Sequence, residues 1–331
     1  MVLKIFRGTG PGVVFLIFIV ALLVWFIPLT QPQYNASFHY DIHPMPLYNL
    51  LSAVVGTNSL LAVSVSFLLV LIISILIVSF NTAVFFINER TFLPGLIYIL
   101  FSGLFPHFQT LNPVLPAALF LIITLRRIMA SYRRSGVSIN FFDAAILISV
   151  GALFYANLIW FGLVIFIGIG ILRTANLKEI FFAILGLCIP VAITLGILYV
   201  SGKDISMFFA DCRYNLFAET GDYYLSRIVI SGLFIAGLSL LVCFFYLLSS
   251  MNTKKIKSRK TFTELIWILI ISATIFFVLP STSVEIIYIA AIPISYLFAH
   301  YFVMNKKKVL PEIIFTALFI VIAVFQIWRL F

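Results

Sequence analysis

Three side chains able to do acid–base chemistry stand at alternate positions in the segment His39-Tyr40-Asp41-Ile42-His43. Asp41 is the only acid between positions 31 and 58, and that stretch contains no Lys or Arg. A carboxylate between two imidazoles can act as a general base or help to bind a divalent metal ion. In an extended segment all three side chains would share one face. An ordinary polar loop could have the same composition, so the spacing leaves both interpretations open.

A second polar group lies between positions 201 and 227, where acids alternate with aromatic residues. Arg213 and Arg227 belong to it, and a guanidinium pairs bidentately with phosphate oxygens. The alternative for these arginines is a salt bridge with Asp211 or Asp222. Two further residues are candidates for substrate binding because they fall at the same predicted end of the protein: His107 and Glu285.

The rest of the chain indicates a membrane protein. Of the 331 residues, 63% are hydrophobic and 10% are charged, which is too little polar surface for a soluble fold. Runs long enough to span a bilayer recur throughout. We predict an all-α, polytopic bundle with about eleven spans, at 11–30, 59–87, 91–106, 111–126, 141–155, 157–173, 179–200, 226–250, 263–280, 284–303 and 310–328.

The basic residues predict the orientation of this bundle. With the N-terminus in the cytoplasm, most of the 21 Lys and Arg residues fall in cytoplasmic turns, above all at 126–134, 254–260 and 306–308. The C-terminus is then extracytoplasmic, as are the two polar groups described above. The net charge of +10 therefore reflects topology, with membrane lipids rather than nucleic acid as partners. We expect a multi-pass protein of the bacterial inner membrane.

Acids near the cytoplasmic ends of the predicted spans have a structural explanation. Asp143, Glu179, Glu264 and Glu312 each open such a span, where a negative charge complements the helix dipole. No charged residue is expected in the middle of a span, which disfavours a proton relay or an ion-coupled transporter.

The order of these features resembles the GT-C superfamily of membrane glycosyltransferases, which use polyprenyl-phosphate-linked sugars. Those proteins carry an acid after the first span, then surface helices and a long second helix. Here Asp41, the stretch 47–55 and the run 59–87 stand in that order. Arg90, a Pro-containing external turn and a basic loop follow. The chain departs from the pattern at Leu111-Asn112-Pro113, where many such enzymes have a second acid.

The resemblance covers residues 10–175, so we describe one membrane domain, 1–331, with a GT-C-like module at 10–175 and C-terminal helices at 176–331. It implies that Asp41 is catalytic, with His43 assisting. By their residue types and their predicted external position, His39, His107, Arg213, Arg227 and Glu285 are the candidates for contacts with substrate or phosphate. The residues of segments 125–129 (LRRIM) and 140–160 (NFFDAAILISVGALFYANLIW) also resemble an uncharacterised inner-membrane family of Bacteroidetes. That resemblance implies no activity.

Three functions are open at this point. The first is glycosyl transfer from a polyprenyl-phosphate substrate at the outer face, with or without a divalent metal cofactor. The second is a non-catalytic subunit or scaffold of an envelope-assembly complex, whose partners would be other membrane subunits. The third is transport of a lipid or small solute.

Overall fold

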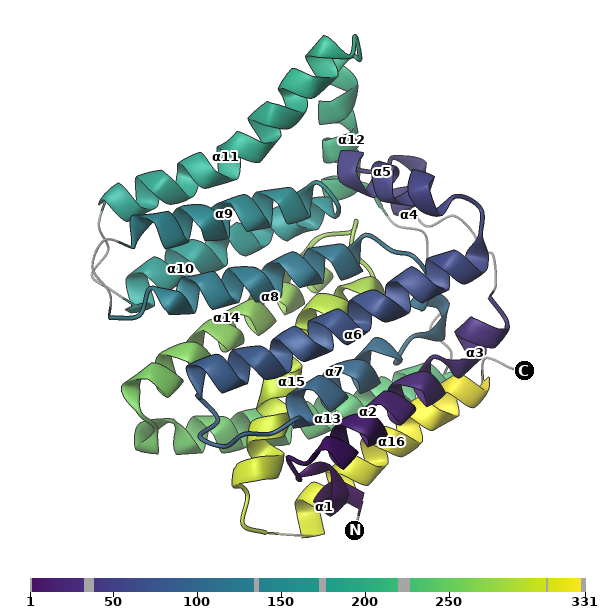
Figure 1. Ribbon diagram of the computed structural model, residues 1–331, viewed down its shortest axis with the longest axis vertical. Helices are drawn as coiled ribbons and strands as arrows, with labels where there is room; N and C mark the ends of the chain where they lie inside the picture. The colour runs from purple at the N-terminus through teal and green to yellow at the C-terminus, as the bar shows by residue number, and fades with distance from the viewer. Residues whose placement is uncertain are drawn as a thin grey trace.

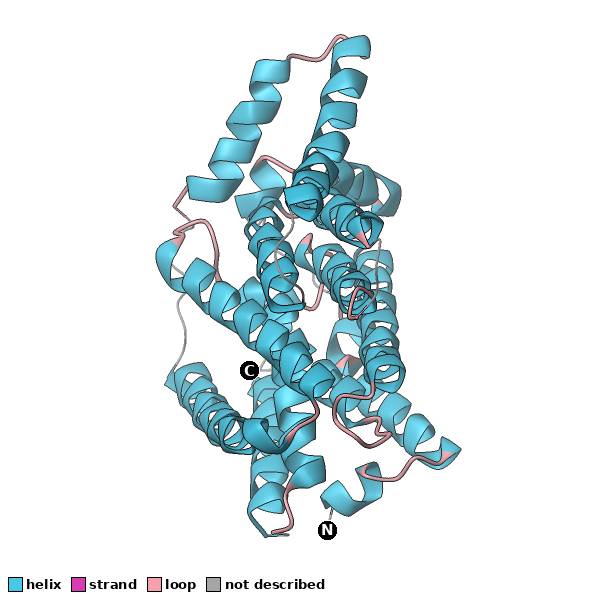
Figure 2. Ribbon diagram, turned by 90° about the vertical axis from the view of Figure 1, so that its left-hand side faces the viewer, coloured by secondary structure: helices cyan, strands magenta, loops and turns pink. Residues whose placement is uncertain are grey.

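The computed structural model is helical along the part of the chain it describes, residues 2–32, 39–133, 137–172, 177–219, 227–307 and 309–328 (Figure 2). The first half contains α1 (Val2–Phe6), α2 (Pro11–Val24), α3 (Phe26–Thr30), α4 (His39–Ile42), α5 (Pro46–Val55), α6 (Ser59–Val84), α7 (Leu93–Ser102), η1 (Pro106–Phe108) and α8 (Val114–Ala130). The second half contains α9 (Ser138–Ala152), η2 (Ala156–Phe161), α10 (Gly162–Leu172), α11 (Leu177–Val200), α12 (Ile205–Phe217), α13 (Arg227–Ser250), η3 (Met251–Thr253), α14 (Ile256–Val278), η4 (Val284–Ile286), α15 (Ile287–Met304) and α16 (Val309–Trp328).

Every predicted apolar run contains a helix, and the prediction of an all-α fold is confirmed for the described residues. Six of the described helices are long and apolar enough to cross a membrane: α6, α11, α13, α14, α15 and α16. The protein is therefore an integral membrane protein with several spans. The total of eleven spans and the orientation of the termini stay predictions.

Two helices form the centre of the bundle, α7 and α15, which pack against each other (Figure 1). Every residue of α7 is buried. The Tyr296 hydroxyl of α15 donates to the Ile77 carbonyl of α6 at 2.8 Å. Gly95 of α7 faces α6 so closely that a Cβ atom there would lie 2.7 Å from Ser74 Oγ. Small residues of this kind let membrane helices approach each other closely.

A second close contact joins α9 to α11, the long helix that projects at the top of Figure 1. The buried residues of α11 are Glu179, Ala183, Gly186 and Pro190, spaced as one stripe of a helix. The remaining surface of α11 is largely apolar and exposed, which suits contact with lipid. Because α12 follows α11 in the chain, the contact between α9 and α11 helps to position α12.

The basic turns meet at one end of the bundle. Lys260 Nζ donates to the Leu172 carbonyl at 3.2 Å and lies 5.8 Å from the Tyr132 ring. The Arg7 guanidinium donates to the carbonyl of Phe302. Turns that are far apart in sequence therefore share one end, in agreement with the charge pattern used to predict the orientation.

One helix boundary changes the interpretation of an acid. The predicted span 263–280 is part of a longer helix, α14, which begins at Ile256. Glu264 is thus not at a helix start: it is the ninth residue of α14 and is fully buried. The expectation that Glu264 opens a helix and complements its dipole is wrong, because the first turn of α14 contains no acid.

Candidate functional site

Asp41 is on α4, which lies at the opposite end of the bundle from the basic turns (Figure 1). Its side chain accepts a hydrogen bond from a residue of α5. The Tyr48 hydroxyl of α5 donates to Asp41 Oδ1 at 3.0 Å and lies 3.4 Å from the Leu111 carbonyl. Tyr48 is buried and Asp41 is exposed. Burial, and then the charge of Asp41, raise the pKa of Tyr48 above its usual value. Tyr48 therefore stays a neutral donor that holds one oxygen of an accessible carboxylate.

The segment that contains His39, Asp41 and His43 is not extended, so the condition for aligning their side chains on one face is not met. Residues 39–42 form a helical turn, in which positions two apart point to different sides. The side chain of His39 lies outside the described part of the structure. Among the described residues no group of three or more His, Cys, Asp and Glu side chains is arranged to hold a metal ion.

His43 pairs instead with an acid from a segment far away in sequence. Its Nδ1 lies 2.8 Å from Asp211 Oδ1 of α12, and its ring lies 4.6 Å from the Tyr214 ring. The side chains of His43 and Asp211 are 39% and 25% exposed. A carboxylate at Nδ1 orients an imidazole and favours the tautomer whose Nε2 can accept a proton. The pair is a candidate acid–base dyad beside Asp41.

The buried side-chain amide of Asn215 connects α12 to the backbone of His43. Asn215 Nδ2 donates to the His43 carbonyl at 2.7 Å and to the Asp211 carbonyl at 2.9 Å. Asn157 Nδ2 donates to the Asn215 carbonyl at 3.2 Å and lies 3.3 Å from Ser281 Oγ. Four segments that are distant in sequence are joined here through hydrogen bonds to backbone and side chains.

We expect Asn215→Ala to destabilise the protein by about 2 kcal/mol, because it leaves the His43 carbonyl without this donor in a partly buried site. The change is measured as a lower midpoint of thermal unfolding in detergent. Asn49→Ala, at an exposed position of α5, is the control and should leave the midpoint unchanged. Equal midpoints for the two variants would contradict the proposed role of Asn215.

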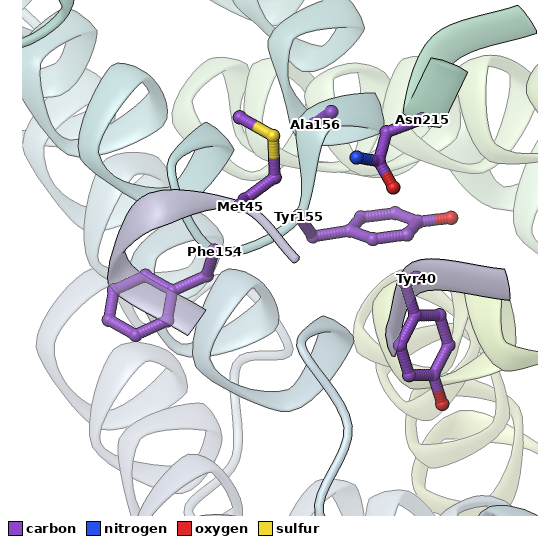
Figure 3. Close-up of a pocket in the computed structure, with 6 residues that line it drawn as sticks. All are labelled: Tyr40, Met45, Phe154, Tyr155, Ala156 and Asn215. Atoms are coloured by element: carbon purple, nitrogen blue, oxygen red, sulfur yellow. The ribbon is translucent and has the colours of Figure 1, made fainter. Parts of the chain in front are cut away.

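A narrow crevice opens next to this network (Figure 3). It is lined by Tyr40, Met45, Phe154, Tyr155, Ala156 and Asn215, whose side chains leave no room for a water molecule between them. Figure 3 shows the ring of Tyr155 between Tyr40 and the Asn215 amide. The lining mixes aromatic rings with polar tips, and a sugar ring or a lipid headgroup would enter only where these side chains move apart.

Glu285 lies at the same end but is enclosed by protein. It is fully buried, and its carboxylate accepts from the Ser283 backbone N–H at 3.1 Å and from the Ser283 hydroxyl. The Tyr155 hydroxyl lies beside the same carboxylate. Glu285 thus supports the crevice through Tyr155 rather than facing the open surface.

The remaining predicted site residues are His107, Arg213 and Arg227. His107 is exposed in η1, and Arg213 is exposed on α12. Arg227 is the first residue of α13, and its side chain lies outside the described part of the structure. The alternative salt bridge of Arg213 with Asp211 is not formed, because Asp211 pairs with His43; Asp222 lies outside the described residues.

Cys212 is not a candidate nucleophile. Burial, and then the neighbouring Asp211, raise the pKa of its thiol to about 11. A thiol with so high a pKa is almost entirely protonated at neutral pH, and the thiolate is the reactive form.

Sequence reasoning singled out Asp41, His43 and Glu285 but did not pair them with Tyr48, Asp211 and Ser283, and it considered Asp211 only as a partner of an arginine. Nothing in a single sequence joins His43 to a residue 168 positions away. The one available signal was the distribution of basic residues, which placed both segments at the same predicted end of the bundle.

Comparison with known proteins adds a family but no activity. No curated protein and no solved structure matches the chain. A family model described as "Family of unknown function (DUF6427)" matches residues 42–331, from the end of α4 to the last residue. Because this match covers far more than half of the chain, the protein belongs to the DUF6427 family of unknown function.

Proposed function

We propose that this protein is a glycosyltransferase of the bacterial inner membrane that uses a sugar linked to a polyprenyl phosphate at the outer face. In this proposal Asp41 takes the proton from the acceptor hydroxyl. The resulting oxygen bonds to the anomeric carbon of the sugar while the bond from that carbon to the carrier phosphate breaks. The carrier leaves as the polyprenyl phosphate, so atoms and charge balance.

The observation that supports the proposal most is the setting of Asp41. The carboxylate is accessible at the surface, and the Tyr48 hydroxyl donates to Asp41 Oδ1 and fixes its position. A base must be both reachable and held in place to contribute to catalysis. The crevice beside Tyr40, one residue away, is lined by aromatic and polar side chains and would take the sugar or headgroup once those side chains separate.

The substrate class in this proposal comes from the GT-C resemblance of the sequence. Three short helices, α3, α4 and α5, stand between α2 and α6, which has 26 residues. We assign the recognition of the carrier phosphate to Arg213 and Arg227, with His107 nearby at the same end. The dyad of His43 and Asp211 positions the acceptor, with His39 as a further contact.

Asp41→Asn tests this function in cells that make the protein. The variant keeps the size of the side chain and its acceptor for Tyr48 but cannot take up a proton. We expect transfer to fall by about 100-fold or more, so that the lipid-linked sugar accumulates while the protein level is unchanged. Lipid extracts analysed by mass spectrometry measure the accumulation.

Asp204→Asn is the matched control for that experiment. Asp204 is an exposed acid in the second polar group, at 201–227, where it caps α12 by accepting from the Ser206 backbone N–H at 2.8 Å. Asn caps helices equally well, so this variant should transfer sugar normally. If Asp41→Asn also leaves the lipid-linked glycans normal, Asp41 is not a catalytic base, and the scaffold function with partner subunits becomes the better description.

A further inference from the structure

One buried acid stands outside the proposed active site. Glu264 lies on α14, about 12 Å along the axis from the first residue of that helix, and is fully buried. Neither of its carboxyl oxygens has a hydrogen-bond partner among the described residues. α14 is one of the helices long and apolar enough to span a membrane.

The surroundings of Glu264 are apolar and close. It faces α10 at Gly168, where an added Cβ atom would lie 3.0 Å from Glu264 Oε1 and 2.8 Å from Ile128 Cγ2. Glycine at this position leaves room for the carboxyl group between α10 and α14. In the described part of the protein, no backbone or side-chain donor forms a hydrogen bond with this carboxyl group.

The charged groups on the elements around Glu264 are engaged elsewhere or point outward, and none forms an ion pair with it among the described residues. On α8, which contributes Ile128, Arg127 pairs with Asp143 at 3.8 Å and Arg126 is exposed. α10 and η2 contain no titratable residue. On α14 itself, Lys260 donates to the Leu172 carbonyl at 3.2 Å. On α15, His300 contacts Lys254 Nζ, and the hydroxyls of Tyr288 and Tyr296 donate to the carbonyls of Phe108 and Ile77. Glu285 of η4 is held by Ser283.

An isolated carboxylate in such a place costs so much free energy that the group takes up a proton instead. We propose that Glu264 is a proton-binding site inside the membrane bundle, which holds its proton at neutral pH. The ligand is the proton itself, because one carboxyl group without other oxygen or nitrogen donors cannot hold a metal ion. A buried ionisable group on a membrane-spanning helix is a candidate functional site. The site is independent of Asp41 and of sugar transfer.

The apolar reagent N,N′-dicyclohexylcarbodiimide tests the proposal on the full chain in vesicles of phosphatidylethanolamine and phosphatidylglycerol. It reacts with protonated carboxyl groups: the acid proton moves to a carbodiimide nitrogen, and a carboxyl oxygen bonds to the central carbon. We expect mass spectrometry to find the adduct on Glu264 at pH 7, and its loss in Glu264→Gln. Asp204 is the internal control: hydrogen bonds from Ser206 lower the pKa of its exposed carboxyl group, so it is ionised at pH 7 and should stay unlabelled.

Infrared spectroscopy provides a second measurement that does not need the reagent to reach the site. The wild-type protein at pH 7 should show the C=O stretching band of a buried protonated carboxyl group, and Glu264→Gln should lack it. The adduct or the loss of this band supports the proposal. A spectrum that Glu264→Gln leaves unchanged, together with unlabelled Glu264 in the wild-type protein, overturns it.

Discussion

Gly186→Val should destabilise the protein by about 3 kcal/mol or more, because α9 leaves no room for a side chain at this position of α11. An added Cβ atom would lie 2.6 Å from the Phe142 carbonyl oxygen and 2.7 Å from Ala145 Cβ. The carbonyl belongs to the backbone and cannot turn aside as the end of a flexible side chain could. The two helices must therefore separate.

The loss should extend to the candidate site. α9 leads into the turn that carries Phe154 and Tyr155, and α11 leads into α12 with Asp211. Separation of α9 from α11 would move the wall of the crevice relative to the partner of His43. We therefore expect Gly186→Val to reduce activity as well as the midpoint of thermal unfolding.

Gly196→Val is the control on the same helix. Gly196 is exposed, and an added Cβ atom there would meet nothing within 4 Å. Its effect on the free energy of unfolding should stay below about 1 kcal/mol. Thermal unfolding of both variants in the same detergent decides the matter, and similar midpoints would show that α9 and α11 are not in close contact.

The second large effect is expected at Glu285. Glu285→Gln should cost about 3 kcal/mol, since one carboxylate oxygen becomes an NH₂ group that faces a donor of Ser283. A buried donor without an acceptor, or two donors facing each other, is the cause of the loss. Denaturant titration of the purified protein measures it.

Glu264→Gln offers a matched comparison for Glu285→Gln because both acids are fully buried. Neither oxygen of Glu264 accepts a hydrogen bond from a described residue, so the neutral amide should change stability by less than about 1 kcal/mol. A loss at Glu264 as large as that at Glu285 would mean that Glu264 has a partner and is not a protonated, isolated acid.

The fold class could be predicted from the sequence because a membrane imposes a simple rule. Backbone polar groups in lipid must be satisfied within each segment, so long apolar runs become helices. Even the short α5 was expected at 47–55 and is found at Pro46–Val55. The boundaries were less predictable, since charged residues such as Lys257 and Lys260 extend α14 beyond its apolar part.

The candidate site could be predicted only in part. Asp41 and His43 are recognisable because polar residues are scarce in this chain and these two stand directly after an apolar run. The roles assigned to His39, His107, Arg213 and Arg227 stay predictions. Local backbone also mattered: the helical turn at 39–42 separates side chains that an extended segment would have aligned.

Composition and the distribution of charge alone establish a helical membrane protein whose polar segments gather away from its basic turns, because hydropathy and charge act on each segment separately. Packing decided which of those polar residues meet. The pairs Tyr48 with Asp41 and His43 with Asp211, and the isolation of Glu264, depend on how helices distant in sequence approach one another. A glycine such as Gly168 or Gly186 sets that approach by the side chain it lacks, and its effect appears only when the facing helix is in place.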